Sequence, residues 1–256
     1  MINRILTVAL LVGLVAGIAT SIVQHGVTVP VIIAAEAFEG AEPVAQQTPA
    51  ATPAETAPAH DHSSMGHTAA AAGDHGAGGH HHDANAWAPA DGIERIAFTT
   101  LSTVVASIGF ALVLLAVMIL ANEPITPRRA LAWGAGGFVA FSLAPAMGLA
   151  PELPGMEAAP VVARQAWWLL TVAATAGGLW LIVRGRSALL IVAGVALLIV
   201  PHLIGAPRLD TVAASAVPAE LASRFAASVL GVAAIMWALI GAGIGLVWQR
   251  LDKTPT

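Results

Sequence analysis

The chain has 256 residues, of which 57% are hydrophobic and only 10% are charged, and its formal net charge at pH 7 is -4. A soluble domain carries about 25% charged residues, so this composition predicts an integral membrane protein. The absence of cysteine excludes disulfides, thiolate metal sites and thiol redox chemistry, and the absence of a G-x-x-x-x-G-K-[ST] loop excludes an ATP-driven motor of that type within the chain.

The first apolar run, residues 5–23, is uncharged and follows Arg4. Its 19 residues are enough to cross a bilayer of about 30 Å. The alternative is a cleaved signal peptide with an A-x-A site at residues 35–37, but the apolar part of such a peptide has only about 7–15 residues. Because the apolar character here continues past His25 and Pro30, we expect a retained helix.

The next segment, residues 36–94, differs sharply in composition. It is rich in Ala, Pro, Gly, Thr and His, and it carries nine carboxylates without any Lys or Arg. Such a segment cannot bury enough apolar area to offset its chain entropy. We therefore expect a long, disordered, acidic and His-rich loop.

Five further apolar stretches complete the prediction of an all-α, polytopic membrane protein with about six transmembrane helices. They are residues 96–121, 130–149, 165–183, 187–203 and 225–248. The stretch 187–203 is the weakest, because Pro201-His202 stands at its end. The expected divisions are residues 1–35 (first helix), 36–94 (loop), 95–250 (five-helix region) and 251–256 (cytoplasmic tail). Glycines spaced four apart predict close helix packing in the first and last spans; they are Gly13, Gly17, Gly241 and Gly245.

Basic residues predict the orientation. Six spans place both termini on one side, and that side holds seven of the eleven basic residues, namely Arg4, Arg128, Arg129, Arg184, Arg186, Arg250 and Lys253. The positive-inside rule predicts that this side is cytoplasmic and that the His-rich loop is extracytoplasmic. Thirteen of the fifteen acidic residues, all except Glu123 and Asp252, then face outward and attract cations.

One connection, within residues 142–168, carries more special residues than a helical hairpin needs, since two to eight ordinary residues suffice. It contains Pro151, Glu152, Pro154, Glu157, Pro160, Arg164, Gln165, Trp167 and Trp168. We interpret Glu152 as a candidate metal ligand that Pro151 and Pro154 hold in place. Arg164 and Gln165 support it, and Arg164 pairs with either Glu152 or Glu157. The alternative is a rigid turn with an aromatic belt, in which Trp167 and Trp168 are interfacial anchors.

Seven of the nine histidines lie in the loop, where imidazole nitrogens suit Zn, Cu, Ni, Co or Fe. They are His60, His62, His67, His75, His80, His81 and His82. An H-x-H pair and an H-H-H run on a flexible chain suit capture and transfer of metal better than catalysis. The alternative is a solvated low-complexity linker.

The other two histidines, His25 and His202, stand at the outer ends of the first and fifth spans. Ionisable residues within membrane spans are functional candidates, so both are candidate ligands; a haem between them is an alternative. No Asp, Glu, Lys or Arg lies in the middle of a span. If the membrane part needs energy, that energy must come from a gradient or a partner.

Five blocks of the sequence together resemble the CbtA-type cobalt transporter subunits. They are Gln24…Pro30…Ala35-Glu36-Ala37-Phe38-Glu39, residues 145–155 (PAMGLAPELPG), residues 164–168 (RQAWW), residues 201–207 (PHLIGAP) and residues 217–250. The resemblance covers nearly everything except residues 42–91, and Ala150 stands where the family pattern has a second proline. It implies cobalt uptake for cobalamin synthesis together with a small single-span, His-bearing membrane subunit.

The sequence thus predicts a membrane subunit for uptake of a divalent transition metal, with Co²⁺ as the transported ion and Ni²⁺ as the next candidate. We expect no enzymatic activity, no organic cofactor and no nucleic-acid partner. The expected partners are the lipid bilayer and the small membrane subunit. The alternative is a membrane-anchored buffer or assembly factor for nickel, zinc or copper that does not transport. Uptake measurements separate the two, since a transporter moves metal and a buffer only binds it.

Overall fold

The computed structural model describes residues 1–38, 89–209 and 215–252, and within these ranges every regular element is a helix. In chain order the elements are α1 (Ile2–Val27), α2 (Val29–Glu36), α3 (Ile93–Leu120), α4 (Pro127–Phe138), the π-helix η1 (Val139–Leu143), α5 (Ala144–Ala146), α6 (Val161–Arg184), α7 (Ala188–Ile204) and α8 (Ala219–Asp252). All six apolar stretches of the sequence are helical. The seven loop histidines lie outside the described residues.

Four helices, α1, α3, α6 and α8, are long and apolar enough to cross a membrane. Helix α7 is apolar but has 17 residues, or about 25 Å at 1.5 Å per residue. The elements α4, η1 and α5 follow one another without a gap from residue 127 to 146. The described part of the chain is therefore all helical and contains four helices of spanning length, as expected of a membrane protein.

The helix ends follow from local sequence. Asn122 adopts a positive φ of 54° after α3, and Pro127 begins α4, where a missing N–H costs nothing. The Thr126 hydroxyl accepts a hydrogen bond from the Arg129 N–H at 3.3 Å, so it caps α4. Ser187 caps α7 in the same way through the Leu190 N–H.

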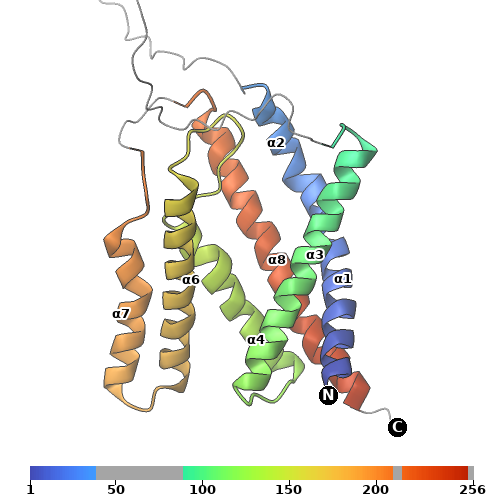
Figure 1. The fold of residues 1–256 in the computed structure, drawn as a ribbon, viewed down its shortest axis with the longest axis vertical. Helices are drawn as coiled ribbons and strands as arrows, with labels where there is room; N and C mark the ends of the chain where they lie inside the picture. The colour runs from blue at the N-terminus through green and yellow to red at the C-terminus, as the bar shows by residue number, and fades with distance from the viewer. Residues whose placement is uncertain (39–88, 210–214, 253–256) are drawn as a thin grey trace, which may run out of the picture.

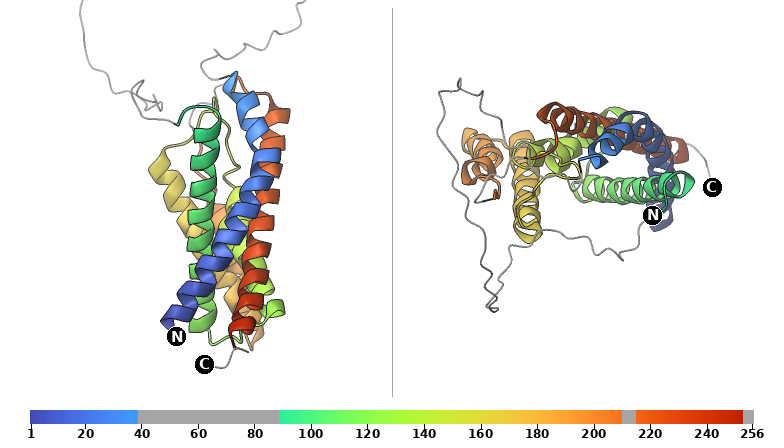
Figure 2. Two further views of the ribbon diagram at one scale, coloured as in Figure 1. Left: turned by 90° about the vertical axis from the view of Figure 1, so that its right-hand side faces the viewer. Right: turned by 90° about the horizontal axis from the view of Figure 1, so that it is seen from above.

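Helices α1, α3, α4 and α8 form a bundle in which α1 packs against both α3 and α8, and α8 packs against α4 (Figures 1 and 2). Its core contains the fully buried Leu115, Met118, Trp237, Ile240 and Ile244. Glycines let the backbones approach as predicted. A Cβ on Gly13 would lie 2.4 Å from the Ile108 Cα, and one on Gly245 would lie 2.4 Å from the Pro127 Cα.

Helices α6 and α7 form a separate hairpin on the opposite side from α1 and α3 (Figure 1). Among the described helices α7 contacts only α6, while α6 also contacts α4, η1 and α5. Glycines allow α6 and α7 to pack closely, since a Cβ on Gly178 would lie 2.7 Å from the Gly194 carbonyl oxygen. The long apolar side chains of α7 are largely exposed, as a lipid-facing helix requires.

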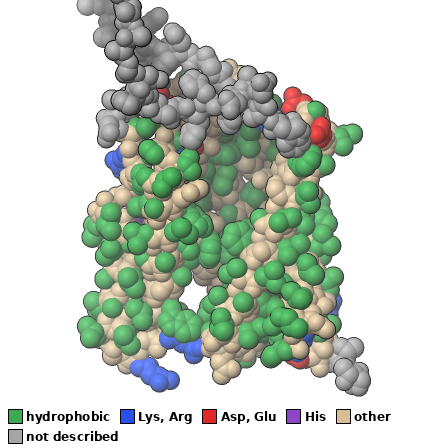
Figure 3. Space-filling view, in the orientation of Figure 1, with side chains coloured by type: hydrophobic (Ala, Val, Ile, Leu, Met, Phe, Trp, Pro, Cys, Tyr) green, Lys and Arg blue, Asp and Glu red, His purple; other side chains and the backbone are tan. Residues whose placement is uncertain are grey.

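The two chain termini lie at the same end of the molecule (Figure 1). There Arg4 pairs with Asp252 at 2.5 Å and lies over the Trp248 ring. At this end Glu123 also binds Arg129 at 2.6 Å and Arg184 at 3.2 Å, which ties the α3–α4 turn to α6. Figure 3 shows apolar side chains along the flanks and Arg side chains at this lower end.

Candidate functional site at the connection between α5 and α6

The connection of residues 147–160 is packed against the bundle rather than projecting from it. Leu153 is 3% exposed and lies in a small apolar cluster with Val31 and Ala35 of α2 and Phe225 of α8. Gly155 follows Pro154 with a φ of 79°, a conformation that favours glycine. The proline-rich turn is therefore fixed by packing as well as by its restricted backbone.

Glu152 and Arg164 form an ion pair across the start of α6. The Arg164 Nη2 lies 2.7 Å from the Glu152 Oε2, and both side chains are only about a quarter exposed (29% and 25%). Burial raises the pKa of the Glu152 carboxyl above its usual range, and the positive charge of Arg164 acts against that rise. Of the two pairings expected for Arg164, the structure contains the one with Glu152.

Two cavities meet at this ion pair. The larger, of about 490 Å³, lies between α5, α6 and α8, and its polar lining consists of Ser142, Arg164 and Gln165. The smaller, of about 380 Å³, is lined by Glu152, Glu157, Met156 and Arg208 among others. Leu149, Ala150 and Pro151 line both cavities. The connection thus separates a carboxylate-lined cavity from a cavity lined by neutral polar groups and one arginine.

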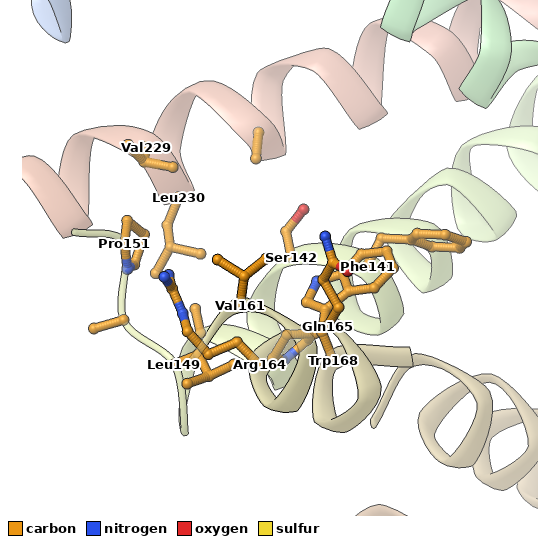
Figure 4. Close-up of a pocket in the computed structure, with 14 residues that line it drawn as sticks. Phe141, Ser142, Leu149, Pro151, Val161, Arg164, Gln165, Trp168, Val229 and Leu230 are labelled. Carbon is orange, nitrogen blue, oxygen red and sulfur yellow. The ribbon is translucent and has the colours of Figure 1, made fainter. Parts of the chain in front are cut away.

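Figure 4 shows how the larger cavity is built. Ser142 and Gln165 project toward the space below α8, where Val229 and Leu230 close it, while the guanidinium of Arg164 extends toward Pro151. Ser142 belongs to the π-helix η1. Pro145 cannot donate to the carbonyl four residues before it, so the helix ladder is disturbed there. Such π-bulges occur often at functional sites.

His202 stands in the last turn of α7, beside Trp167 of α6. The two rings are 6.0 Å apart in an edge-to-face arrangement, and the Trp167 Nε1 donates to the Pro201 carbonyl at 3.2 Å. Trp167 is 5% exposed, so it is a buried link between α6 and α7 and not an interfacial anchor. Trp168 lines the larger cavity and packs against Phe141.

His25 does not join this group. His25 and His202 could converge only if the first, third, fourth and fifth spans packed together, and α1 contacts neither α4, α6 nor α7 in the described part of the chain. Helix α1 packs instead against α3 and α8, and the His25 Nε2 lies 3.3 Å from the Thr100 Oγ1. The predicted position of both histidines at outer span ends did not determine which helices pack together.

No group of three or more His, Asp or Glu side chains suited to one metal ion occurs within the described residues. The loop histidines fall outside them, so Glu152 and His202 are the predicted ligands that the structure places near the connection. Met156 and Arg208 were not predicted as site residues. Their only sequence signal is position, since each lies in a connection next to a proline-containing motif.

Comparison with known proteins gives one family. The family model described as "Probable cobalt transporter subunit (CbtA)" matches residues 2–249. No curated protein and no solved structure matches this chain. The family match covers nearly the whole sequence, including the connection of residues 147–160 and both cavities.

Proposed function

This chain belongs to the family of probable cobalt transporter subunits, and we propose that it carries a divalent transition metal ion, Co²⁺, into the cell. The near-complete family match is the observation that carries this proposal. The described helices supply a membrane scaffold, and within the described residues the connection between α5 and α6 supplies buried polar groups and cavities on the end away from the termini.

We infer six spans, with α4–η1–α5 and the short α7 added to the four long helices, and cytoplasmic termini in the bacterial inner membrane. The basic residues support this orientation, because seven of eleven fall on the side of the termini. The segment of residues 39–88 is then extracytoplasmic. Its seven histidines capture metal and raise its concentration at the outer surface, as imidazole tracts do.

The carboxylate-lined cavity is proposed as the entrance. Metal reaches Glu152 there and must displace Arg164, because the guanidinium and the metal ion compete for the same carboxylate. Arg164 thus keeps Glu152 oriented and paired while no metal is present. The metal then passes Pro151 into the larger cavity, where Ser142 and Gln165 offer neutral oxygens. His202, held by Trp167, contributes a nitrogen at the same end of the hairpin.

A carboxylate with one imidazole is a sparse oxygen and nitrogen set. It is acceptable to Co²⁺ and Ni²⁺, and it binds too weakly to trap the ion. A small single-span, His-bearing membrane subunit is the proposed partner, and cobalt supply for cobalamin synthesis is the proposed purpose. The word subunit in the family description supports an assembly with other chains.

Uptake of radioactive Co²⁺ by cells that express the full chain tests the proposal. Glu152→Gln should abolish uptake at limiting metal while the protein level in the membrane stays unchanged. Glu220→Gln is the matched control, because Glu220 is an exposed carboxylate in the first turn of α8 and lines neither cavity. Metal that binds to the cells without entering them would indicate a buffer, and normal uptake by Glu152→Gln would refute this entrance.

A further inference from the structure

The short helix α2 lines neither cavity, yet it packs directly behind the connection between α5 and α6. Val31 and Ala35 of α2 lie in one apolar cluster with Leu153, the residue that follows Glu152 in the chain. Ala35 is 0% exposed and Leu153 is 3% exposed, so this contact excludes solvent. The connection therefore rests on α2 at the residue next to the proposed metal ligand.

The same cluster joins α2 to α8 and reaches the edge of both cavities. Its buried members are Val31, Ala35, Leu153, Val217 and Phe225. Two partly buried side chains packed against it face the cavities, because Met156 lines the smaller one and Val229 lines the larger one. A shift of α2 would therefore change the walls of the proposed entrance.

Backbone contacts make the turn after Glu152 a compact unit. The Leu153 N–H donates to the Met156 Sδ at 3.3 Å, and the Met156 N–H donates to the Leu153 carbonyl at 3.2 Å. A Cβ added to Gly155 would lie 3.2 Å from the Phe38 carbonyl oxygen, just beyond α2. The turn is thus seated against the end of α2, and Glu152 is attached to it directly.

An ion pair joins the end of α2 to α3. Among the described helices α2 packs against α1 and α8 but not against α3, and the ends of α2 and α3 stand apart (Figures 1 and 2). The Arg95 guanidinium of α3 bridges them, since its Nη2 donates to the Glu36 Oε1 and its Nη1 to the Glu36 Oε2 at 3.4 Å. A two-point contact of this kind fixes orientation as well as distance. Glu36 is the last residue of α2 and follows the buried Ala35.

Stability alone does not explain this ion pair well. Both of its side chains are about one-third exposed (32% and 33%), and such pairs contribute little to the stability of a fold. The apolar packing of α2 on α1 and α8 remains without it. Groups that orient a metal ligand from behind, in contrast, have a large effect on metal affinity. Affinity and stability therefore separate the two roles.

We propose that α2, held by the Arg95–Glu36 ion pair, positions Glu152 for the metal through its contact with Leu153. Arg95 and Glu36 are then positioning residues that do not touch the metal. The proposal rests on the proposed function, in which Glu152 is the ligand at the entrance. Asp91 provides a matched comparison, because it also pairs with Arg95, at 3.2 Å, but lies one turn away on the same side of the bridge and is 92% exposed.

The initial rate of radioactive Co²⁺ uptake, measured over a range of Co²⁺ concentrations in cells that express the full chain, tests the proposal. Arg95→Gln, Glu36→Gln and Leu153→Ala should each raise the half-saturating Co²⁺ concentration about tenfold, as loss of a group that orients a metal ligand does. The maximal rate and the protein level should stay unchanged. Leu153→Met, which conserves volume, should restore the wild-type value. Asp91→Asn is the control and should leave it unchanged.

A purely structural role would lower the protein level and the maximal rate without changing the half-saturating concentration. That result would overturn the proposal, and so would an equal rise in Asp91→Asn.

A second measurement does not depend on transport. The chain has no cysteine, so Glu157→Cys places one spin label on an exposed residue of the connection. Arg95→Gln and Glu36→Gln should make this label more mobile, whereas a label at Arg186→Cys, in the exposed turn between α6 and α7, should not respond. An unchanged spectrum at residue 157, or equal loosening at residue 186, would overturn the proposal. If wild type takes up no Co²⁺, the transport function fails, and the label alone decides whether α2 positions the connection.

Discussion

A test of the packing around the proposed entrance is the substitution Gly148→Ala. Gly148 lies where the end of α5, the ring of Trp167 and the chain after α7 meet. A Cβ added there would lie 2.3 Å from the Trp167 Cη2, 2.7 Å from its Cζ2 and 3.2 Å from the Ala206 Cβ. Both indole atoms belong to the six-membered ring of a side chain that is 5% exposed and cannot move aside freely.

The size of the effect follows from these contacts. Overpacking of a tight site costs about 1–3 kcal/mol, and we expect Gly148→Ala to destabilise the chain by that amount. Trp167→Phe loses the hydrogen bond to the Pro201 carbonyl and part of the ring volume, which together cost about 2–3 kcal/mol. Phenylalanine lacks the two indole atoms that the new Cβ would strike. The double variant should therefore be more stable than the sum of the two single effects predicts, by about 1 kcal/mol or more.

Unfolding of the purified chain in detergent, followed through tryptophan fluorescence, measures the three variants. Gly136→Ala is the matched control, because Gly136 lies inside α4 with open space at its Cβ position. That change should be neutral or stabilise by about 0.5–1 kcal/mol. Strict additivity of Gly148→Ala and Trp167→Phe would refute the contact between Gly148 and the indole ring.

Three further outcomes are expected. Replacing all seven loop histidines by alanine should reduce Co²⁺ uptake at scarce metal but much less at abundant metal. The difference between variant and wild type should fade below roughly pH 6, because imidazole with an ordinary pKa of about 6.5 is protonated there. Equal loss at every metal concentration would place the loop in the permeation path. Arg164→Gln should shift the acid limit of uptake to higher pH. Burial already raises the Glu152 pKa, and loss of the opposing cation raises that pKa further, so that protons compete with metal at higher pH. Arg164→Lys should shift the acid limit less, and an unchanged pH profile of uptake would show that Glu152 does not bind the metal. A periplasm-specific reporter fused near residue 70 should be active and one fused after residue 252 inactive, whereas the reverse pattern would overturn the proposed orientation.

The positions of the helices could be predicted from the sequence because hydrocarbon excludes unpaired backbone groups and charges. Each predicted stretch matches a helical segment to within about six residues at either end. Which helices pack together could not be predicted, because an apolar side chain is accommodated equally well by lipid and by a neighbouring helix. Leu189 and Trp167 belong to similar apolar stretches, yet Leu189 is 76% exposed and Trp167 is 5% exposed.

At the candidate site, sequence reasoning identified the residues that interact locally. The pairing of Arg164 with Glu152 follows from a short connection between two helices. The separation of His25 from His202 depends on which helices pack together, and both histidines satisfy the same hydropathy pattern. The hydrogen bonds between α1 and α3, Ser21 with Thr100 and Thr103 with Gln24, could not be predicted, because their partners are 79 residues apart on two helices whose pairing hydropathy does not determine.

The contact of Arg4 with Trp248 and Asp252 bears on the order of synthesis. The first helix finds one of its two main neighbours, α8, only when the ribosome has nearly finished the chain. Until then α1 has only α3 in place beside it, whereas α6 and α7 already form their own hairpin. Chains that end before α8 should therefore insert into the membrane with an unfilled position next to α1, and quality-control proteases that recognise unassembled membrane helices would find them there.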